Sequence, residues 1–251
     1  MPLRSEFWST SSIGLVRKSN QDAVGCFPER QLFVVCDGMG GLQEGERASR
    51  AAVTAIGRYF RTEAPQGDGN ARSDWSHTLS EAISISNTEL FEEGLRISGD
   101  PENPALGTTV VILKVDAVQE RAFWAHVGDS RLYRVRQSQL MLLTADHTMY
   151  GERYAYGAVI PTDLPHTNQL LQAIGVRANV RARTGASDIK ADDLFLLCTD
   201  GVSGLIDPET MQAELTSSAP LKDIAESLIR LALQNGGRDN ASLILVRIVP
   251  A

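Results

Sequence analysis

Short apolar runs recur along the chain and predict β-strands. They lie at residues 31–36, 108–115, 121–127, 131–135, 194–198 and 242–249, and they are rich in β-branched or other apolar side chains. In residues 131–135 apolar and polar side chains alternate, which is typical of a strand with one face in water. The turn Gly128-Asp129-Ser130 precedes that run, so we expect a hairpin with the strand at 121–127.

Four segments carry apolar residues at the spacing of an α-helix. They span residues 45–60, residues 74–93, a short segment that opens at Asp207-Pro208-Glu209, and residues 221–234. Asp207 is suited to cap a helix whose first turn contains proline. Gly94 can end the second helix, and Asn235-Gly236-Gly237 can end the last one.

The order of these elements predicts an α+β fold. Neighbouring strands that pair as hairpins favour antiparallel sheets, and helices then cover the outer faces of the sheets. The polar stretches at 61–72 and 98–104 are short enough to be surface loops. We therefore expect one domain over residues 1–251.

Composition narrows the classes of partner and location. The 251 residues carry a formal net charge of −7, which argues against nucleic acid as the main partner, because phosphate backbones are bound by clustered Lys and Arg. No apolar run approaches the ~20 residues of a membrane helix, and the N-terminus lacks a signal peptide. Cys26, Cys36 and Cys198 have neither disulfide nor zinc spacing. We expect a cytoplasmic protein that binds neither nucleic acid nor membrane.

Two Asp-Gly pairs follow apolar strands. Asp37-Gly38 comes directly after the strand at 31–36, and Asp200-Gly201 follows the strand at 194–198 by one residue. A buried strand fixes the backbone at its end, so the carboxylate has a defined position, while glycine lets the chain turn and a ligand approach the backbone. Two such strand ends at one rim of a pair of sheets would bring the carboxylates together.

Three further acids stand at the ends of predicted elements. Asp22 precedes the first strands, Asp129 lies in a turn, and Asp239 precedes the last strand. Each acid alone is more often a cap, a turn residue or a salt-bridge partner. Together, converging carboxylates would repel one another unless hard divalent cations such as Mg²⁺ or Mn²⁺ neutralised them. The four histidines are scattered and form no zinc pattern.

The acids belong to an ordered set of motifs that resembles a known family. The motifs are Arg17-Lys18-Ser19-Asn20-Gln21-Asp22, Asp37-Gly38-Met39-Gly40-Gly41, Gly107-Thr108-Thr109, Gly128-Asp129-Ser130-Arg131, Asp146-His147, Thr199-Asp200-Gly201 and Gly237-Arg238-Asp239-Asn240. In this order and spacing they resemble the type 2C, metal-dependent (PPM) serine/threonine protein phosphatases in their compact bacterial form. The resemblance covers residues 11–249. It implies a single phosphatase domain built as an αββα sandwich, with helices outside two antiparallel sheets.

The resemblance implies a metal centre with two divalent cations, Mn²⁺ or Mg²⁺. Asp37 would bridge the cations, and the backbone carbonyl of Gly38 would be a further ligand. Asp200 and Asp239 would bind the first cation. Asp129 matches a residue that helps to bind a third, weaker ion in bacterial relatives.

The resemblance also implies roles beside the cations. Asp22 would hold water molecules bound to the cations, and Asn240 would orient neighbouring groups. Arg17 would bind the substrate phosphate, which suits its planar pair of donors. With Asp37 and Asp239, Arg17 and Asp22 make up the expected catalytic residues.

The chain departs from the family pattern at three positions. Met39 stands where some relatives have a histidine that acts as general acid, so another group or water must protonate the leaving oxygen. Gln21 stands where some have a metal-associated glutamate, and Gly204 where many have an aspartate for the third ion. The third ion therefore loses one expected ligand here.

The expected activity is hydrolysis of phosphoserine and phosphothreonine in proteins by water activated between two cations. A variable flap at residues 146–168, with 168–175 as its return, would contact the substrate. The enzyme would oppose a serine/threonine kinase, and a kinase that controls a bacterial secretion system is one candidate. Two alternatives stay open: a phosphatase dedicated to one regulatory partner protein, and a pseudophosphatase that only binds.

Overall fold

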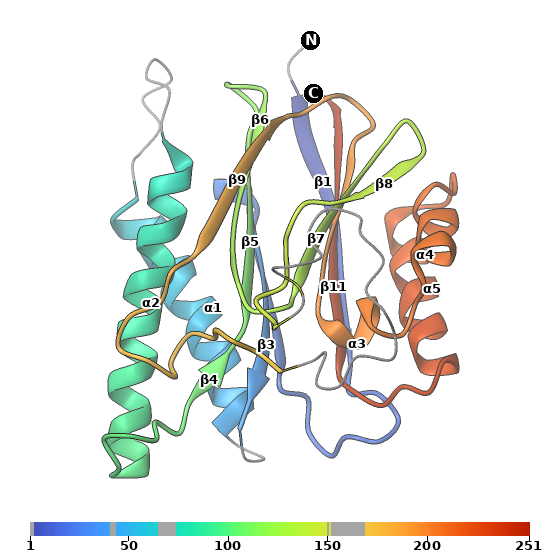
Figure 1. The fold of residues 1–251 in the computed structure, drawn as a ribbon. Coiled ribbons are helices and arrows are strands. Elements are labelled where there is room, and N and C mark those ends of the chain that lie inside the picture. Colours follow the sequence, from blue (N-terminus) through green and yellow to red (C-terminus); the bar gives the residue numbers. More distant parts are fainter. Residues whose placement is uncertain (1–2, 41–43, 65–73, 150, 152–168) are drawn as a thin grey trace.

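The structure is a computed structural model that describes residues 3–40, 44–64, 74–149, 151 and 169–251. Figure 1 shows its layers: α1 and α2 lie on one side, two β-sheets fill the middle, and α4 and α5 lie on the other side. This arrangement is the αββα sandwich expected from the sequence.

One sheet has the strand order β1-β11-β10-β7-β8. Its strands are β1 (Leu3–Ser12), β7 (Arg131–Arg136), β8 (Gln139–Leu142), β10 (Leu194–Cys198) and β11 (Ala241–Pro250). All four of its pairings are antiparallel. The longest pairing joins the two ends of the chain, with Leu3 opposite Pro250 and Ser12 opposite Ala241.

The other sheet has the order β2-β3-β5-β6-β9, with the short β4 paired to β3. Its strands are β2 (Asp22–Phe27), β3 (Leu32–Met39), β4 (Gly107–Thr108), β5 (Val110–Asp116), β6 (Arg121–Val127) and β9 (Arg183–Asp188). The single-turn helix η1 (Pro28–Arg30) connects β2 to β3. Every pairing in this sheet is also antiparallel.

Helices cover the outer faces of both sheets. On the β2–β9 sheet, α1 (Glu44–Thr62) and α2 (Trp75–Ser98) bury their apolar sides against β3, β5 and β6. On the other sheet, α3 (Asp200–Ser203), α4 (Pro208–Leu215) and α5 (Leu221–Gln234) pack on β7, β10 and β11. In α5 the buried residues recur three or four positions apart, which is the spacing of one helix face.

A third apolar cluster lies between the two sheets. Phe33, Val111 and Leu113 from one sheet meet Phe195 and Val246 from the other, and all five side chains are fully buried. Burying side chains of this size stabilises the fold by about 1.5–3 kcal/mol each. This middle layer fixes the two sheets against each other, and so it sets the positions of the loops at their common rim.

The expected hairpin between residues 121–127 and 131–135 is wrong. β6 pairs with β5 and β9, while β7 pairs with β8 and β10 in the other sheet. The turn at Gly128, which has φ +105°, therefore carries the chain across the sandwich. Both strands are buried on more than one side, so their sequences fit a place in either sheet.

The predicted end of the second helix is also wrong. α2 continues to Ser98 and ends at Gly99, whose φ of +66° is the left-handed conformation that glycine adopts readily. Gly94 instead lies inside the helix, where a Cβ atom would come within 3.1 Å of Leu106 N and Pro104 Cβ. Glycine at position 94 therefore serves close packing.

Candidate metal centre

The two Asp-Gly strand ends meet at one rim of the sandwich. Asp37 lies near the end of β3, and Asp200 begins α3 directly after β10, so they come from opposite sheets. The charge of Asp200 raises the pKa of Asp37, which places the two carboxyl groups close together. Both line a pocket of about 240 Å³, whose other lining residues are Arg17, Gln21, Gly38, Met39, Gly40, Thr109, Asp129, Leu170 and Asp239.

Glycine follows each of these aspartates because the backbone is crowded there. A Cβ atom on Gly38 would lie 2.0 Å from the carbonyl oxygen of Gly45 at the start of α1. A Cβ atom on Gly201 would lie 1.8 Å from the carbonyl oxygen of Asn240. Neither position has room for a side chain, so the Asp-Gly pairs are required by the packing that brings these segments together.

Asp22 lies behind the pocket. It is directly opposite Asp37 across the β2–β3 ladder, so the two side chains are on the same face of the sheet. The Thr199 hydroxyl donates to Asp22 Oδ2 at 2.9 Å, while Asp22 Oδ1 is buried with no partner among the described residues. Asp22 is only 7% exposed. It supports the pocket from below and does not line it.

Asn240 ties the segment before β2 to the start of β11. Its amide nitrogen donates to the carbonyl oxygens of Ile13 at 2.9 Å and Ser19 at 3.0 Å. Its amide oxygen accepts from the Gln21 backbone N–H at 2.8 Å. Since Arg17 lies between the two carbonyls that Asn240 holds, this single side chain fixes the loop that presents Arg17.

Arg17 and Asp239 form an ion pair at the mouth of the pocket. The Arg17 guanidinium donates to Asp239 Oδ2 at 2.5 Å, and the backbone N–H of Asn240 donates to Asp239 Oδ1 at 2.8 Å. Both oxygens of Asp239 are therefore engaged. The charges of Asp37 and Asp200 add to that hydrogen bond in raising the pKa of Arg17.

Thr109 holds Asp37 from the neighbouring strand, a contact that the sequence analysis did not identify. The Thr109 backbone N–H donates to the Asp37 carbonyl oxygen at 2.8 Å, and the Asp37 N–H donates to Thr109 Oγ1 at 3.0 Å. The Thr109 hydroxyl also lies 2.7 Å from that of Ser130. The signal in the sequence was the polar Gly107-Thr108-Thr109 at the start of an apolar run, which separates β4 from β5.

Asp129 reaches the same pocket from the turn that crosses between the sheets. Burial, together with the charges of Asp200 and Asp146, raises the pKa of Asp129 to about 7. Gly204, the C-cap of α3, offers no carboxylate near it. The structure thus brings Asp129 to the site without the partner expected at position 204.

The carboxyl groups at this site repel one another. Burial and the charges of Asp22 and Asp200 raise the pKa of Asp37 well above its ordinary value. Burial likewise raises the pKa of Asp22 to about 7, assisted by Asp200 and Asp239 and opposed by hydrogen bonds from Ser242 and Thr199. Asp200 Oδ1 and Asp22 Oδ1 are buried without partners among the described residues. This set of hard oxygen donors, short of positive charge, fits divalent cations.

The described residues nevertheless hold no ready-made cage. Among them, no three His, Cys, Asp or Glu side chains already converge on one point that could hold a metal ion. The reason is visible at Asp239, whose carboxylate is turned to Arg17. Asp37 and Asp200 are adjacent, and Asp239 could join them only by giving up part of its contact with Arg17.

The expected flap at residues 146–168 falls largely on residues 152–168, which lie outside the described part of the chain. Its base is fixed by Asp146, which accepts three hydrogen bonds from Arg131 at 2.9, 3.2 and 2.7 Å. Its return contributes Leu170 to the pocket. Within the residues that the structure describes, no helix has the length and apolar character needed to cross a membrane.

Comparisons with known proteins agree with this arrangement. The family model described as protein phosphatase 2C matches residues 16–243. The chain is 30% identical over 242 residues to protein phosphatase PhpP of Streptococcus pneumoniae, which covers 94% of each chain. The site residues from Arg17 to Asp239 all lie inside the matched region.

Solved structures are similar over almost the whole chain. PppA, described as a key regulatory component of T6SS in Pseudomonas aeruginosa, superposes with a TM-score of 0.81 and 28% identity over 98% of both chains. The catalytic domain of the serine/threonine protein phosphatase PstP, solved in complex with two manganese ions, gives a TM-score of 0.82 and 28% identity over 99% of this chain and 100% of that one. With the sandwich fold and the carboxylates at its rim, this chain belongs to the protein phosphatase 2C family.

Proposed function

We propose that this chain is a protein serine/threonine phosphatase, which uses two divalent cations, Mn²⁺ or Mg²⁺, to hydrolyse phosphoserine and phosphothreonine. One observation carries the proposal. Asp37 and Asp200, from opposite sheets, share one pocket with Asp239 and the exposed Arg17. A pocket with clustered carboxylates on one side and a guanidinium at its mouth is suited to hold cations and a phosphate together.

The carboxylates have separate roles in this proposal. Asp37, Asp200 and Asp239 would hold the two cations, and the Gly38 carbonyl oxygen would be a further ligand. Asp22, buried behind Asp37, would hold water that belongs to the cations. When bound, the cations supply an activated water and positive charge for the phosphoryl oxygens.

The protein's own groups position the substrate and the ligands. Arg17 binds the phosphate with two parallel N–H donors, and Asn240 holds the loop that presents it. Thr109 and Thr199 fix Asp37 and Asp22 by hydrogen bonds. No cysteine takes part, since Cys36 and Cys198 are fully buried in the cores and Cys26 does not line the pocket.

Two features set this chain apart in the proposal. Asp129 would contribute to a third, weaker ion, but glycine at position 204 removes one of the ligands that this ion would need. Met39 lines the pocket but has no proton to donate, so water protonates the leaving oxygen of serine or threonine.

The proposal extends to the setting of the enzyme. We infer a single phosphatase domain over residues 1–251 with its core at 11–249 and a flap near 146–168. We also infer a cytoplasmic location, which fits three cysteines that are all free thiols. The substrates are proteins phosphorylated by a serine/threonine kinase that this enzyme opposes. The similarity to PppA makes a kinase of a bacterial secretion system one candidate.

Hydrolysis of a phosphothreonine peptide with Mn²⁺ tests the function. Asp37→Ala and Asp239→Ala should abolish phosphate release, whereas Asp223→Ala, an exposed acid in α5, should retain it. Near-full activity in either pocket variant would refute the assignment, and a wild-type protein that binds Mn²⁺ without turnover would identify a pseudophosphatase. A protein that cleaves only one phosphoprotein and no peptide would favour the dedicated enzyme.

A further inference from the structure

Three exposed apolar side chains lie in the loop that presents Arg17. Ile13, Leu15 and Val16 precede Arg17 between β1 and β2, and Leu15 and Val16 are 68% and 66% exposed. None of the three belongs to the apolar clusters that form the cores. Single exposed apolar residues are normal on a protein surface, but a run of them beside a polar site marks an interaction surface. We call residues 13–16 the apolar loop.

The backbone of the apolar loop is fixed. The Leu15 N–H donates to the Gly237 carbonyl oxygen at 2.7 Å. Gly14 has φ +79°, and a Cβ atom there would lie 2.3 Å from the Asp239 carbonyl oxygen. These contacts hold the loop against the segment that carries Asp239. The apolar side chains are therefore in place before a ligand arrives, which lowers the entropy cost of binding.

The apolar loop adjoins the carboxylate pocket at two points. Val16 directly precedes Arg17, which lines the pocket. Leu15 packs on Gly237, where a Cβ atom would come within 2.8 Å of Leu15 Cγ. Gly237 lies two residues before Asp239, which also lines the pocket. Leu15 and Val16 thus lie beside the mouth of the pocket, next to the groups proposed to hold phosphate and a cation.

A phosphorylated segment of a protein can span this distance. In an extended chain successive residues are about 3.3–3.6 Å apart, so the three residues on either side of the phosphorylated one lie within about 10 Å of it. Leu15 and Val16 are two and one positions from Arg17, so these flanking residues can reach them when Arg17 binds the phosphate. Residues 13–20 include Arg17 and Lys18 and no acid, which favours the approach of a phosphorylated chain.

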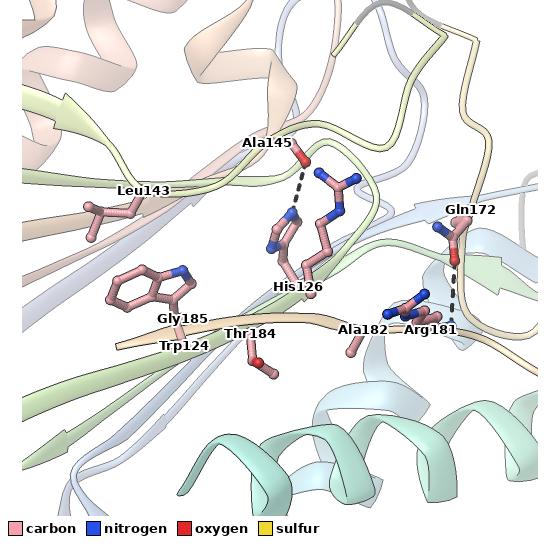
Figure 2. A pocket seen from close by; sticks show the side chains of 10 residues that line it. Trp124, His126, Leu143, Ala145, Gln172, Arg181, Ala182, Thr184 and Gly185 are labelled. Carbon is pink, nitrogen blue, oxygen red and sulfur yellow. Dashed lines mark hydrogen bonds between the residues drawn. The ribbon is translucent and has the colours of Figure 1, made fainter. Parts of the chain in front are cut away.

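Apolar side chains also border the pocket on the return of the flap. Leu170 lines the pocket, and Leu171 is exposed beside it. The Leu171 N–H donates to the His147 carbonyl oxygen at 2.7 Å. Figure 2 shows Gln172 turned toward Arg181, whose backbone N–H donates to the Gln172 amide oxygen at 3.4 Å. Two anchored segments therefore present apolar side chains near the pocket, which suits a substrate with apolar residues beside the phosphorylated one.

We propose that Leu15 and Val16 determine specificity by binding an apolar side chain within three positions of the phosphorylated serine or threonine of a substrate protein. The inference rests on the proposed phosphatase function and names the substrate class of that site. Burial of the apolar side chain against Leu15 and Val16 adds affinity that depends on the sequence of the substrate. A small phosphate ester has no flanking residue and gains nothing from this surface.

A positional scan of phosphothreonine peptides tests the inference. Each peptide carries one leucine, placed at one of the three positions before or after the phosphothreonine, in a background of glycine and serine. With Mn²⁺, kcat/KM should be about five- to tenfold higher for leucine than for asparagine at one or two of these positions. p-Nitrophenyl phosphate serves as the reference substrate without flanking residues. Fluorescence anisotropy with peptides that carry a non-hydrolysable phosphonate should give the same preference without turnover.

Matched variants connect the preference with the apolar loop. In Leu15→Asn combined with Val16→Thr, which changes side-chain size little and adds no charge, the preference for leucine should fall to about twofold or less. The kcat/KM for p-nitrophenyl phosphate should stay within about twofold of the wild type. Val118→Thr changes a valine that is 77% exposed in the turn between β5 and β6, and this variant should keep the full preference. Val16→Thr alone decides the matter if circular dichroism shows that the double variant is unfolded.

The outcomes separate this inference from the proposed function. The inference is overturned if the wild type shows no preference for leucine, or if the folded double variant keeps the preference. A preference in anisotropy without hydrolysis of p-nitrophenyl phosphate contradicts the proposed function and still supports the binding surface. If sedimentation shows a wild-type dimer that the double variant cannot form, the apolar loop is an interface between two copies of the chain, and the inference is likewise overturned.

Discussion

Arg17 donates a hydrogen bond to the carboxylate of Asp239 at 2.5 Å, across 222 positions of sequence. In the proposed function Arg17 binds the substrate phosphate and Asp239 binds a cation. The pair therefore links the two halves of the site. Because the Arg17 side chain is 51% exposed, solvent screens the pair, and a divalent cation can compete with Arg17 for Asp239.

Arg17 can be tested for separate effects on substrate and cation. Arg17→Ala should lower kcat/KM for a phosphothreonine peptide by about a hundredfold, because a bidentate, charged hydrogen bond to phosphate is lost. The kcat/KM of Arg17→Lys should lie between those of the wild type and Arg17→Ala, since lysine keeps the charge but not the paired donors. The affinity for Mn²⁺ should be unchanged or higher in Arg17→Ala, because Asp239 is released. Calorimetry that showed weaker Mn²⁺ binding in this variant would contradict the role given to Arg17.

Met39 predicts a dependence on the leaving group. A histidine at this position would face the pocket, because Met39 lines it. Met39→His should raise the rate for a phosphothreonine peptide by up to about tenfold, since an alkoxide needs a proton as it leaves. The rate for p-nitrophenyl phosphate should change little, because nitrophenolate is a stable anion that leaves without taking up a proton. If Met39→His changed the rates for the peptide and for p-nitrophenyl phosphate equally, the introduced histidine would not be acting as a general acid.

The buried carboxyls predict an unusual pH dependence of stability in the metal-free protein. The pKa of Asp22 rises from 3.8 to about 7 on folding, so the folded state keeps a proton that the unfolded chain releases. The resulting stability is fully present below pH 3.8 and is lost as the pH rises through about 7. Asp129 shifts in the same direction.

Thermal unfolding in the presence of a chelator measures this effect. The Tm should be several degrees lower at pH 8 than at pH 5, and Mg²⁺ should restore it at pH 8 by binding the folded state. Asp22→Asn keeps an acceptor for Thr199 and removes the charge, so its Tm should vary less with pH. An equal dependence on pH in this variant would show that Asp22 is not the group involved.

The cysteines should affect stability and not chemistry. Cys36 and Cys198 are fully buried, and burial raises the pKa of both thiols, so they are poor nucleophiles. Changing all three cysteines to Ser should leave kcat near its wild-type value. The two buried substitutions should each cost about 1–3 kcal/mol of unfolding free energy, because each buries a hydroxyl. Inactivation of the folded enzyme by iodoacetamide would contradict this prediction.

The strongly apolar elements of this fold could be predicted from the sequence, and the polar edge strands could not. The sequence predicts the central strands β3, β10 and β11 and the helix α5 to within a few residues. The strands are buried on both faces and the helix is buried along one side, so their apolar residues form clear patterns. The strands β1 and β9 were missed. β9 has the polar sequence RTGASD, and backbone pairing at a sheet edge leaves little trace in side-chain composition.

The convergence of the site could be predicted from the order of its motifs, but the orientation of its side chains could not. The ends of β3 and β10 place Asp37 and Asp200 together, as their Asp-Gly sequences indicated. The carboxylate of Asp239 is turned toward Arg17 by a contact between residues far apart in the sequence, and no local sequence pattern indicates that orientation. His126 and Arg183 are likewise placed opposite each other only by the β6–β9 ladder, which their sequence positions do not indicate.

Mn²⁺ titration calorimetry of the wild type and Asp37→Asn tests the central claim most directly. Asp37→Asn preserves the size of the side chain and removes the charge proposed to bridge both cations. The wild type should bind two Mn²⁺ ions, and Asp37→Asn should lose measurable binding at both sites together with phosphothreonine hydrolysis. Binding of two ions by Asp37→Asn with wild-type affinity would contradict a metal centre built on Asp37.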